Sequence, residues 1–158
     1  MGGWCGVEIA KRAVSERQVL GDEFASILPI GIGIGRFSCL VHGCCPGRAV
    51  ADVLPESLAT GFQRIGFEFW PAPIVEIAFQ SIFWLACIST RNVSWLKGQK
   101  FHLYLITYGM FRATHEHFRD TVRYEATNIS PYMVLGLIVA MTGAIAFAAR
   151  HYKLNSKT

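Results

Sequence analysis

Charged side chains are scarce in this sequence. They make up 16% of its 158 residues, whereas soluble domains usually carry about 25%. Hydrophobic residues make up 52%, and the mean hydropathy is +0.33. This balance indicates an integral membrane protein. The net charge is +4, but the basic residues lie in short clusters between apolar runs, which argues against a nucleic-acid-binding face and suits cytoplasmic loops.

Several motifs are also absent from the sequence. It has no CxxC pair and no HExxH motif, and the third glycine of "GIGIGR" falls in the wrong place for a dinucleotide fingerprint. The start, "MGGWCGVEIAKR", has neither the basic beginning nor the cleavage site of a signal peptide, so we expect no cleaved leader. We expect no cofactor and no bound metal, and there is no internal repeat.

Long apolar runs, in contrast, are abundant. Residues 131–149 carry no charge and are about long enough to cross a bilayer. Three further spans follow from the pattern, over residues 24–41, 70–89 and from 101 on, and residues 1–10 resemble the end of an incomplete helix. We predict an all-α integral membrane protein with about four to five membrane helices, the first incomplete, in a single membrane domain over 1–158. The spacing of Gly31 and Gly35 predicts close helix packing.

The basic residues predict the orientation of these spans. Nine of the fifteen lie at three sites, residues 11–17, 91–100 and 150 onward, which alternating spans place on one side. The positive-inside rule makes that side the cytoplasm. Lys97 and the C-terminal Lys157 are then predicted to be cytoplasmic, and Arg48 and Asp120 to face outward.

Ionisable residues within apolar spans point to a site. Such groups are costly in a membrane and usually line a cavity or bind a ligand. A helix running on from residue 101 would place four of them on one face: Tyr108, Arg112, Glu116 and Arg119. With Arg36 from another span, two arginines could clamp a phosphate, because guanidinium offers paired donors. Two alternatives stay open: an Arg–Glu pair that only joins helices, and arginines that extend to the lipid headgroups.

The bend "HGCC" allows several kinds of chemistry. His42, Cys44 and Cys45 are a fair set of soft metal ligands or reactive thiols, and His115 and His117 add further nitrogen ligands. Equally, the bend can be a glycine turn packed between helices, with small cysteines chosen for fit. Cys5 and Cys87 lie in apolar stretches and are expected to be buried thiols.

Taken in order, "GIGIGRFSCLVHGCCPGR", "WPAPIVE" and "YGMFRATHEHFRD" followed by an apolar span resemble the prolipoprotein diacylglyceryl transferase family. The resemblance runs from Gly2 to about Tyr152. It implies an enzyme of the bacterial cytoplasmic (inner) membrane, multi-pass and with a cytoplasmic C-terminus. Its substrates would be phosphatidylglycerol and the lipobox cysteine of a preprolipoprotein, which receives the diacylglyceryl group. The implied partners are these two substrates and membrane lipids, with no nucleic acid.

The resemblance also implies roles for individual residues. Those implied to bind substrate are Arg36, Gly43, Gly47, Arg48, Tyr108, Arg112, Glu116 and Arg119. Arg36 and Arg112 would also stabilise charge on the leaving phosphate, and His42 is the nearest substitute for a base.

The departures from the family pattern keep other functions open. Cys39 and Cys44 replace polar residues, and Trp70 replaces a motif histidine. Met1 stands where the family has a histidine thought to take part in catalysis, so we expect little transfer activity from the chain alone. A non-catalytic truncated phospholipid-binding protein and a small membrane thiol or metal protein are the alternatives.

Overall fold

All regular secondary structure in the described part of the chain is helical. A computed structural model describes residues 21–124 and 129–155, together with Gly6 and Ala10. Its helices are α2 (Gly21–Val41), α3 (Val50–Val53), α4 (Glu56–Arg64), α5 (Ala72–Ser89), α6 (Lys100–His115) and α7 (Pro131–Asn155), with short 3₁₀ turns η1 (Ser94–Leu96) and η2 (Glu116–Phe118). Within these ranges no strand forms, only isolated bridges. The predicted all-α class is confirmed.

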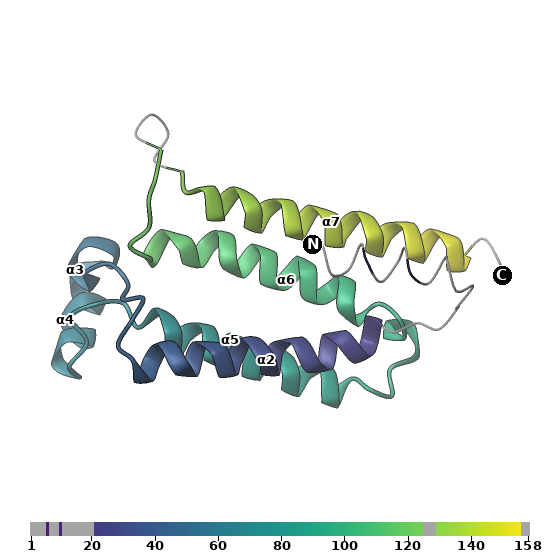
Figure 1. The fold of residues 1–158 in the computed structure, drawn as a ribbon, viewed down its shortest axis with the longest axis horizontal. Coiled ribbons are helices and arrows are strands. Elements are labelled where there is room, and N and C mark those ends of the chain that lie inside the picture. Colours follow the sequence, from purple (N-terminus) through teal and green to yellow (C-terminus); the bar gives the residue numbers. More distant parts are fainter. Residues whose placement is uncertain (1–5, 7–9, 11–20, 125–128, 156–158) are drawn as a thin grey trace.

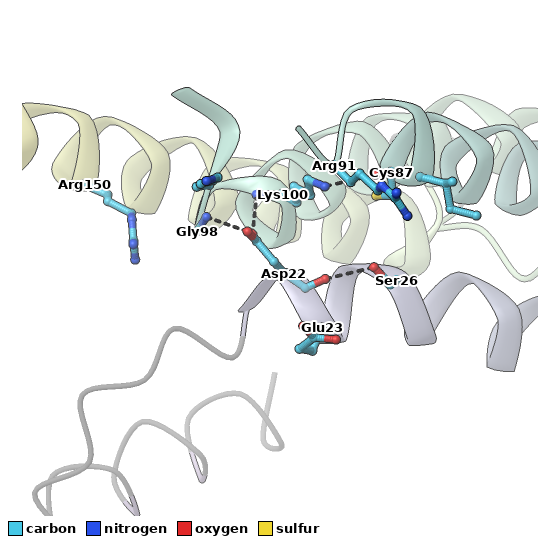
Figure 2. Close-up of a pocket in the computed structure, with 10 residues that line it drawn as sticks. Asp22, Glu23, Ser26, Cys87, Arg91, Gly98, Lys100 and Arg150 are labelled. Carbon is cyan, nitrogen blue, oxygen red and sulfur yellow. Dashed lines mark hydrogen bonds between the residues drawn. The ribbon is translucent and has the colours of Figure 1, made fainter. Parts of the chain in front are cut away.

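Two pairs of helices make up the bundle. Helix α2 packs along α5 and α6 packs along α7, and the pairs meet mainly where α2 contacts α6 (Figure 1). The small helices α3 and α4 lie at the end of the bundle where α2 ends and α5 begins. At the opposite end, the Asp22 carboxylate accepts hydrogen bonds from the backbone N–H groups of Gly98 (2.6 Å) and Lys100 (3.2 Å), beside an open pocket (Figure 2).

Three of these helices are long and apolar enough to cross a membrane: α2, α5 and α7. Large apolar side chains cover their outer faces, for example Ile34 on α2, Ile82 on α5 and Ile145 on α7, each 67% exposed. Such surfaces suit contact with lipid. Helix α6, with 16 residues, is shorter, and the predicted incomplete first helix lies outside the described residues apart from Gly6 and Ala10. The predicted count of four to five spans therefore stays a prediction.

Close helix packing occurs at different glycines from those predicted. Among the residues that the structure describes, a Cβ added to Gly31 or Gly35 would meet nothing within 4 Å, so the described part of the chain does not bear out this prediction. On Gly109 of α6 it would lie 2.6 Å from the backbone of Gly136 and Ala140 in α7. The α6–α7 seam therefore needs small residues because backbone atoms approach directly.

The helix predicted from residue 101 on also ends sooner than expected. Helix α6 stops at His115, η2 follows, and Arg119 is extended with φ −97° and ψ 147°. The backbone there pairs with the loop after α2: Arg48 N–H donates to the Phe118 carbonyl at 2.9 Å, and Gly47 bridges to Arg119. This pairing replaces the helical hydrogen bonds that the sequence pattern predicted.

Candidate functional site

Five charged residues from α2, α5 and the end of α6 form one connected group, here called the arginine–glutamate cluster: Arg36, Glu76, Arg112, Glu116 and Arg119. Glu76 lies at its centre. Its Oε2 accepts from Arg36 Nε at 2.9 Å and lies 3.4 Å from an Arg112 terminal nitrogen.

Glu116 extends the cluster beyond α6. Its Oε2 lies 3.3 Å from the second terminal nitrogen of Arg112 and 4.0 Å from Arg119. Its Oε1 accepts from the Ser130 hydroxyl, just before α7, at 3.2 Å. The side chains of Glu76 and Glu116 are 2% and 1% exposed. Buried carboxylates of this kind are stable only when paired and hydrogen-bonded, as both are here.

The charges of the cluster do not cancel. Three guanidinium groups face two carboxylates, which leaves one positive charge. Arg36 pairs with Glu76 through its Nε, and its guanidinium also interacts with the Cys39 side chain. The Arg36 side chain is 25% exposed, so a ligand can still reach it. An anionic group with one negative charge, such as a phosphodiester, fits both the excess charge and the planar donors.

Aromatic side chains hold the cluster in place. The Tyr108 hydroxyl donates to Glu76 Oε1 at 3.0 Å. Its ring stacks against Tyr104 at 5.4 Å between ring centres, and Phe111 stacks against Phe79 at 4.2 Å. The contacts of Tyr108 with Glu76 and of Phe111 with Phe79 join α5 to α6 across the face that carries Glu76 and Arg112, and Tyr104 supports the Tyr108 ring within α6. The charged groups are therefore fixed before any ligand arrives.

Gly47 fixes the loop that closes this end of the site. Its N–H donates to the Trp70 carbonyl at 3.1 Å. A Cβ at this position would collide with the Trp70 backbone and lie 2.9 Å from the Phe118 carbonyl oxygen. Glycine is required here because two backbone segments approach it closely.

The structure brings together most, but not all, of the predicted site residues. Arg36, Tyr108, Arg112, Glu116 and Arg119 meet in or against the cluster. In the described part of the chain, three others make no hydrogen bond or ion pair with it: His42, Gly43 and Arg48. The exposed His42 ring donates from Nδ1 to the Ser38 carbonyl at 2.9 Å. Gly43 is a turn residue with φ +62°. Arg48 forms hydrogen bonds with Phe118 and Trp70 through its backbone.

Two features of the site were missed by sequence reasoning. Glu76 was the one charge in its apolar span, and that isolation was a signal that it would be paired. The contact between Trp70 and the buried His115 had no such signal, because the residues are distant in sequence: the indole N–H donates to His115 Nε2 at 3.0 Å. The His115 Nδ1 is buried and has no hydrogen-bond partner among the described residues.

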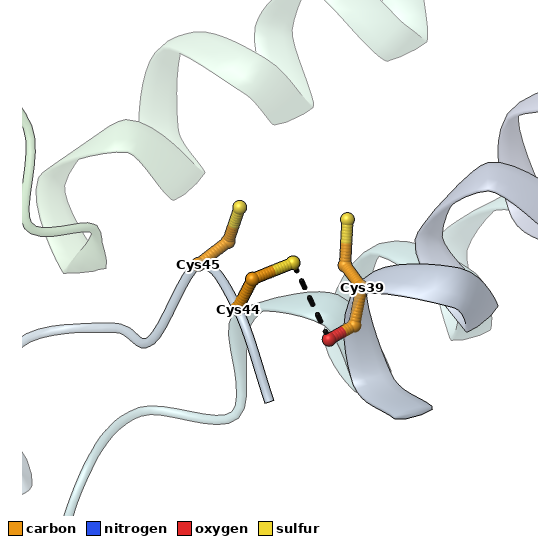
Figure 3. A group of neighbouring side chains, drawn as sticks. All are labelled: Cys39, Cys44 and Cys45. Carbon is orange, nitrogen blue, oxygen red and sulfur yellow. Dashed lines mark hydrogen bonds between the residues drawn. The ribbon is translucent and has the colours of Figure 1, made fainter. Parts of the chain in front are cut away.

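Three cysteine side chains lie beside the cluster, here called the three-thiol cluster: Cys39, Cys44 and Cys45. Their sulfur atoms all lie within 4.8 Å of one another, and all three are free thiols (Figure 3). The Cys44 thiol points to the Cys39 carbonyl at 3.6 Å. The interaction with the Cys39 side chain raises the pKa of the Cys44 thiol.

Comparison with known proteins assigns the family. The family model described as prolipoprotein diacylglyceryl transferase matches residues 2–149. The chain belongs to the prolipoprotein diacylglyceryl transferase family. The resemblance seen in the sequence motifs is thereby confirmed, and with the apolar helices it indicates a bacterial membrane protein.

Curated relatives agree with this assignment. A phosphatidylglycerol–prolipoprotein diacylglyceryl transferase 2 of Clostridium perfringens is 24% identical over 143 residues, covering 88% of this chain and 55% of the relative. A phosphatidylglycerol–prolipoprotein diacylglyceryl transferase of Francisella tularensis is 27% identical over 169 residues, covering 98% of this chain and 60% of the relative. The chain thus spans a little over half the length of these family members. No solved structure matches it.

Proposed function

We propose that this chain binds the phosphodiester of phosphatidylglycerol in the arginine–glutamate cluster and takes part in transfer of its diacylglyceryl group to a cysteine thiol of a prolipoprotein. The observation that carries the proposal is the single uncompensated positive charge, held among buried partners between apolar helices. A phosphodiester supplies one negative charge. The lipid's acyl chains suit the exposed apolar faces of α2 and α5.

The cluster also fits the chemistry of the reaction. When sulfur attacks the glyceryl carbon, the bond from that carbon to the phosphate oxygen breaks, and the phosphate gains a second negative charge. Arg36 and Arg112 both form ion pairs with one carboxylate, that of Glu76. Preorganised donors of this kind stabilise charge that develops in a transition state. The outward-facing position of this end of the bundle and the cytoplasmic position of the C-terminus belong to the same proposal.

Transfer to a lipobox peptide tests this function. Purified protein in detergent should move the diacylglyceryl group from phosphatidylglycerol to a cysteine-containing peptide, detected as a mass increase. Arg36→Lys and Arg112→Lys should each lower the rate by roughly 10²-fold, as loss of one preorganised donor does elsewhere. The control, Arg64→Lys on the exposed face of α4, should leave the rate unchanged.

Two outcomes would contradict the proposal. Transfer that is equally fast in Arg36→Lys, Arg112→Lys and the control would show that the cluster takes no part in the reaction. Tight phosphatidylglycerol binding without any transfer would favour the second candidate, a non-catalytic phospholipid-binding protein. That candidate is favoured by Cys39, Cys44 and Trp70 standing where the family pattern has polar residues.

A further inference from the structure

The three-thiol cluster has a geometry that the proposed role of the arginine–glutamate cluster does not explain. Cys39 comes from the last turns of α2, and Cys44 and Cys45 from the loop after it. The sulfur atoms of Cys39 and Cys45 extend in the same direction, with that of Cys44 between them (Figure 3). Cys45 adopts φ 60°, a left-handed conformation that few residues other than glycine take.

These distances are close to those of a metal site. Zinc–sulfur bonds of about 2.3 Å at tetrahedral angles place neighbouring sulfurs roughly 3.8 Å apart. The three sulfur atoms lie within 4.8 Å of one another, so each pair would have to close by at most about 1 Å. A disulfide, with a bond near 2.05 Å, would need a much larger movement.

The position of the cluster links it to the phosphate site. Cys39 follows Arg36 by three residues on α2, so their side chains are neighbours on the helix surface, and the Arg36 guanidinium interacts with the Cys39 side chain. The same guanidinium binds Glu76. A metal on the thiols would therefore lie about one helical turn from the donors that we assign to the phospholipid.

We propose that Cys39, Cys44 and Cys45 bind one Zn²⁺ ion, and that its open fourth position takes the thiol of the acceptor cysteine as a thiolate. The identity of that acceptor rests on the proposed function; the metal site does not. Three protein ligands with an exchangeable fourth position are the usual form of a catalytic zinc site. Thiolates are soft ligands that suit zinc.

The proposal supplies a way to deprotonate the attacking thiol at the site. A thiol that coordinates zinc is deprotonated outright, and its proton passes to solvent. The thiolate sulfur then bonds to the glyceryl carbon. The bond between that carbon and the phosphate oxygen breaks, and its electron pair leaves on glycerol phosphate, next to Arg36. No oxidant or reductant is involved. Low activity of the chain alone stays a prediction, which the transfer assay tests.

Cobalt binding tests the metal site without any transfer assay. Reduced protein should bind one Co²⁺ per chain with a thiolate-to-cobalt absorption band, and Zn²⁺ should displace it. Cys39→Ser, Cys44→Ser and Cys45→Ser should each weaken binding by at least about tenfold. Cys87→Ser is the matched control, because Cys87 lies apart, against the Ala25 carbonyl in the core between α2 and α5. It should bind like the unchanged protein.

A second measurement avoids any variant that fails to fold. In the unchanged protein, Zn²⁺ should slow maleimide labelling of the three clustered thiols and leave the rate at Cys87 unchanged. Absence of the thiolate band, equal binding in all variants, or a disulfide within the cluster of the freshly isolated protein would overturn the proposal.

The fourth position has its own test. A lipobox peptide with cysteine should shift the cobalt band, and the same peptide with serine should not. Transfer, where it occurs, should stop with a zinc chelator and return with Zn²⁺. Transfer that ignores the chelator would overturn the zinc role and leave the proposed function intact. If the peptide with cysteine shifts the cobalt band but no transfer occurs, the metal site stands and the proposed transfer function fails.

Discussion

Glu76 is the residue on which both helix-borne arginines depend. Its carboxylate forms ion pairs with Arg36 and Arg112 and accepts a hydrogen bond from Tyr108, and its side chain is 2% exposed. Removing its charge leaves the three guanidinium groups of the cluster with one remaining carboxylate, Glu116.

We predict that Glu76→Gln destabilises the protein strongly. Breaking one partner of a buried ion pair typically costs about 3–5 kcal/mol. The midpoint of thermal unfolding in detergent should therefore fall by several degrees. Glu68→Gln removes the same charge from an exposed loop position and should have little effect. Equal midpoints for the two variants would show that Glu76 is not the centre of the cluster.

Several of the site residues could be predicted from the sequence because their chemistry conflicts with their surroundings. Arg36, Arg112 and Glu116 are ionised groups beside or within apolar spans, which is costly unless they are paired or bind a ligand. The bridging role of Glu76 required knowing which faces of α2, α5 and α6 meet. The contact between Trp70 and His115 joins residues 45 positions apart, and no local pattern encodes it.

At the scale of the helices, the seam between α6 and α7 is the tightest part of the described bundle. Gly109, Gly136 and Gly143 each have neighbouring atoms within 3 Å of where a Cβ would stand. The four apolar segments were predictable because 3.6-residue periodicity and length are local properties. The sequence did not predict which glycines lie at a helix–helix seam, because Gly31 and Gly109 look alike until the helices packed against them are known.

We predict that Gly109→Ala and Gly31→Ala have opposite effects. The added methyl group of Gly109→Ala meets the α7 backbone, and overpacking of this kind costs about 1–3 kcal/mol. Gly31→Ala fills open space and should be neutral or slightly stabilising, because alanine favours helix. Thermal unfolding of both variants measures this. A larger loss of thermal stability from Gly31→Ala would instead indicate close helix packing at Gly31, as the sequence pattern predicted.

At the scale of the whole molecule, the two ends of the bundle differ in what they carry. The arginine–glutamate and three-thiol clusters lie where α2 ends and α5 begins. The other end carries Asp22 and the basic residues Arg91, Lys97 and Lys100 (Figure 2). This arrangement agrees with the alternation of spans from which we predicted the orientation.

Cysteine labelling in intact cells checks this orientation. A cysteine introduced at Lys97 should be reached only by reagents that cross the membrane, and one introduced at Asp120 should react with reagents that do not. Reaction of both positions from the same side would contradict the topology. Lys157, predicted to be cytoplasmic, lies outside the described residues.

The most direct test of the central claim is the phospholipid that stays bound to the purified protein. Native mass spectrometry should find one phosphatidylglycerol per chain in the unchanged protein and in Arg64→Lys. Arg36→Lys and Arg112→Lys keep the charge but lose the paired donors, and each lost hydrogen bond to a charged group is worth about 1.5–3 kcal/mol. We expect roughly tenfold or greater weakening in both. Retention of phosphatidylglycerol at the same level in all four proteins would contradict the assignment of this cluster as the phosphate site.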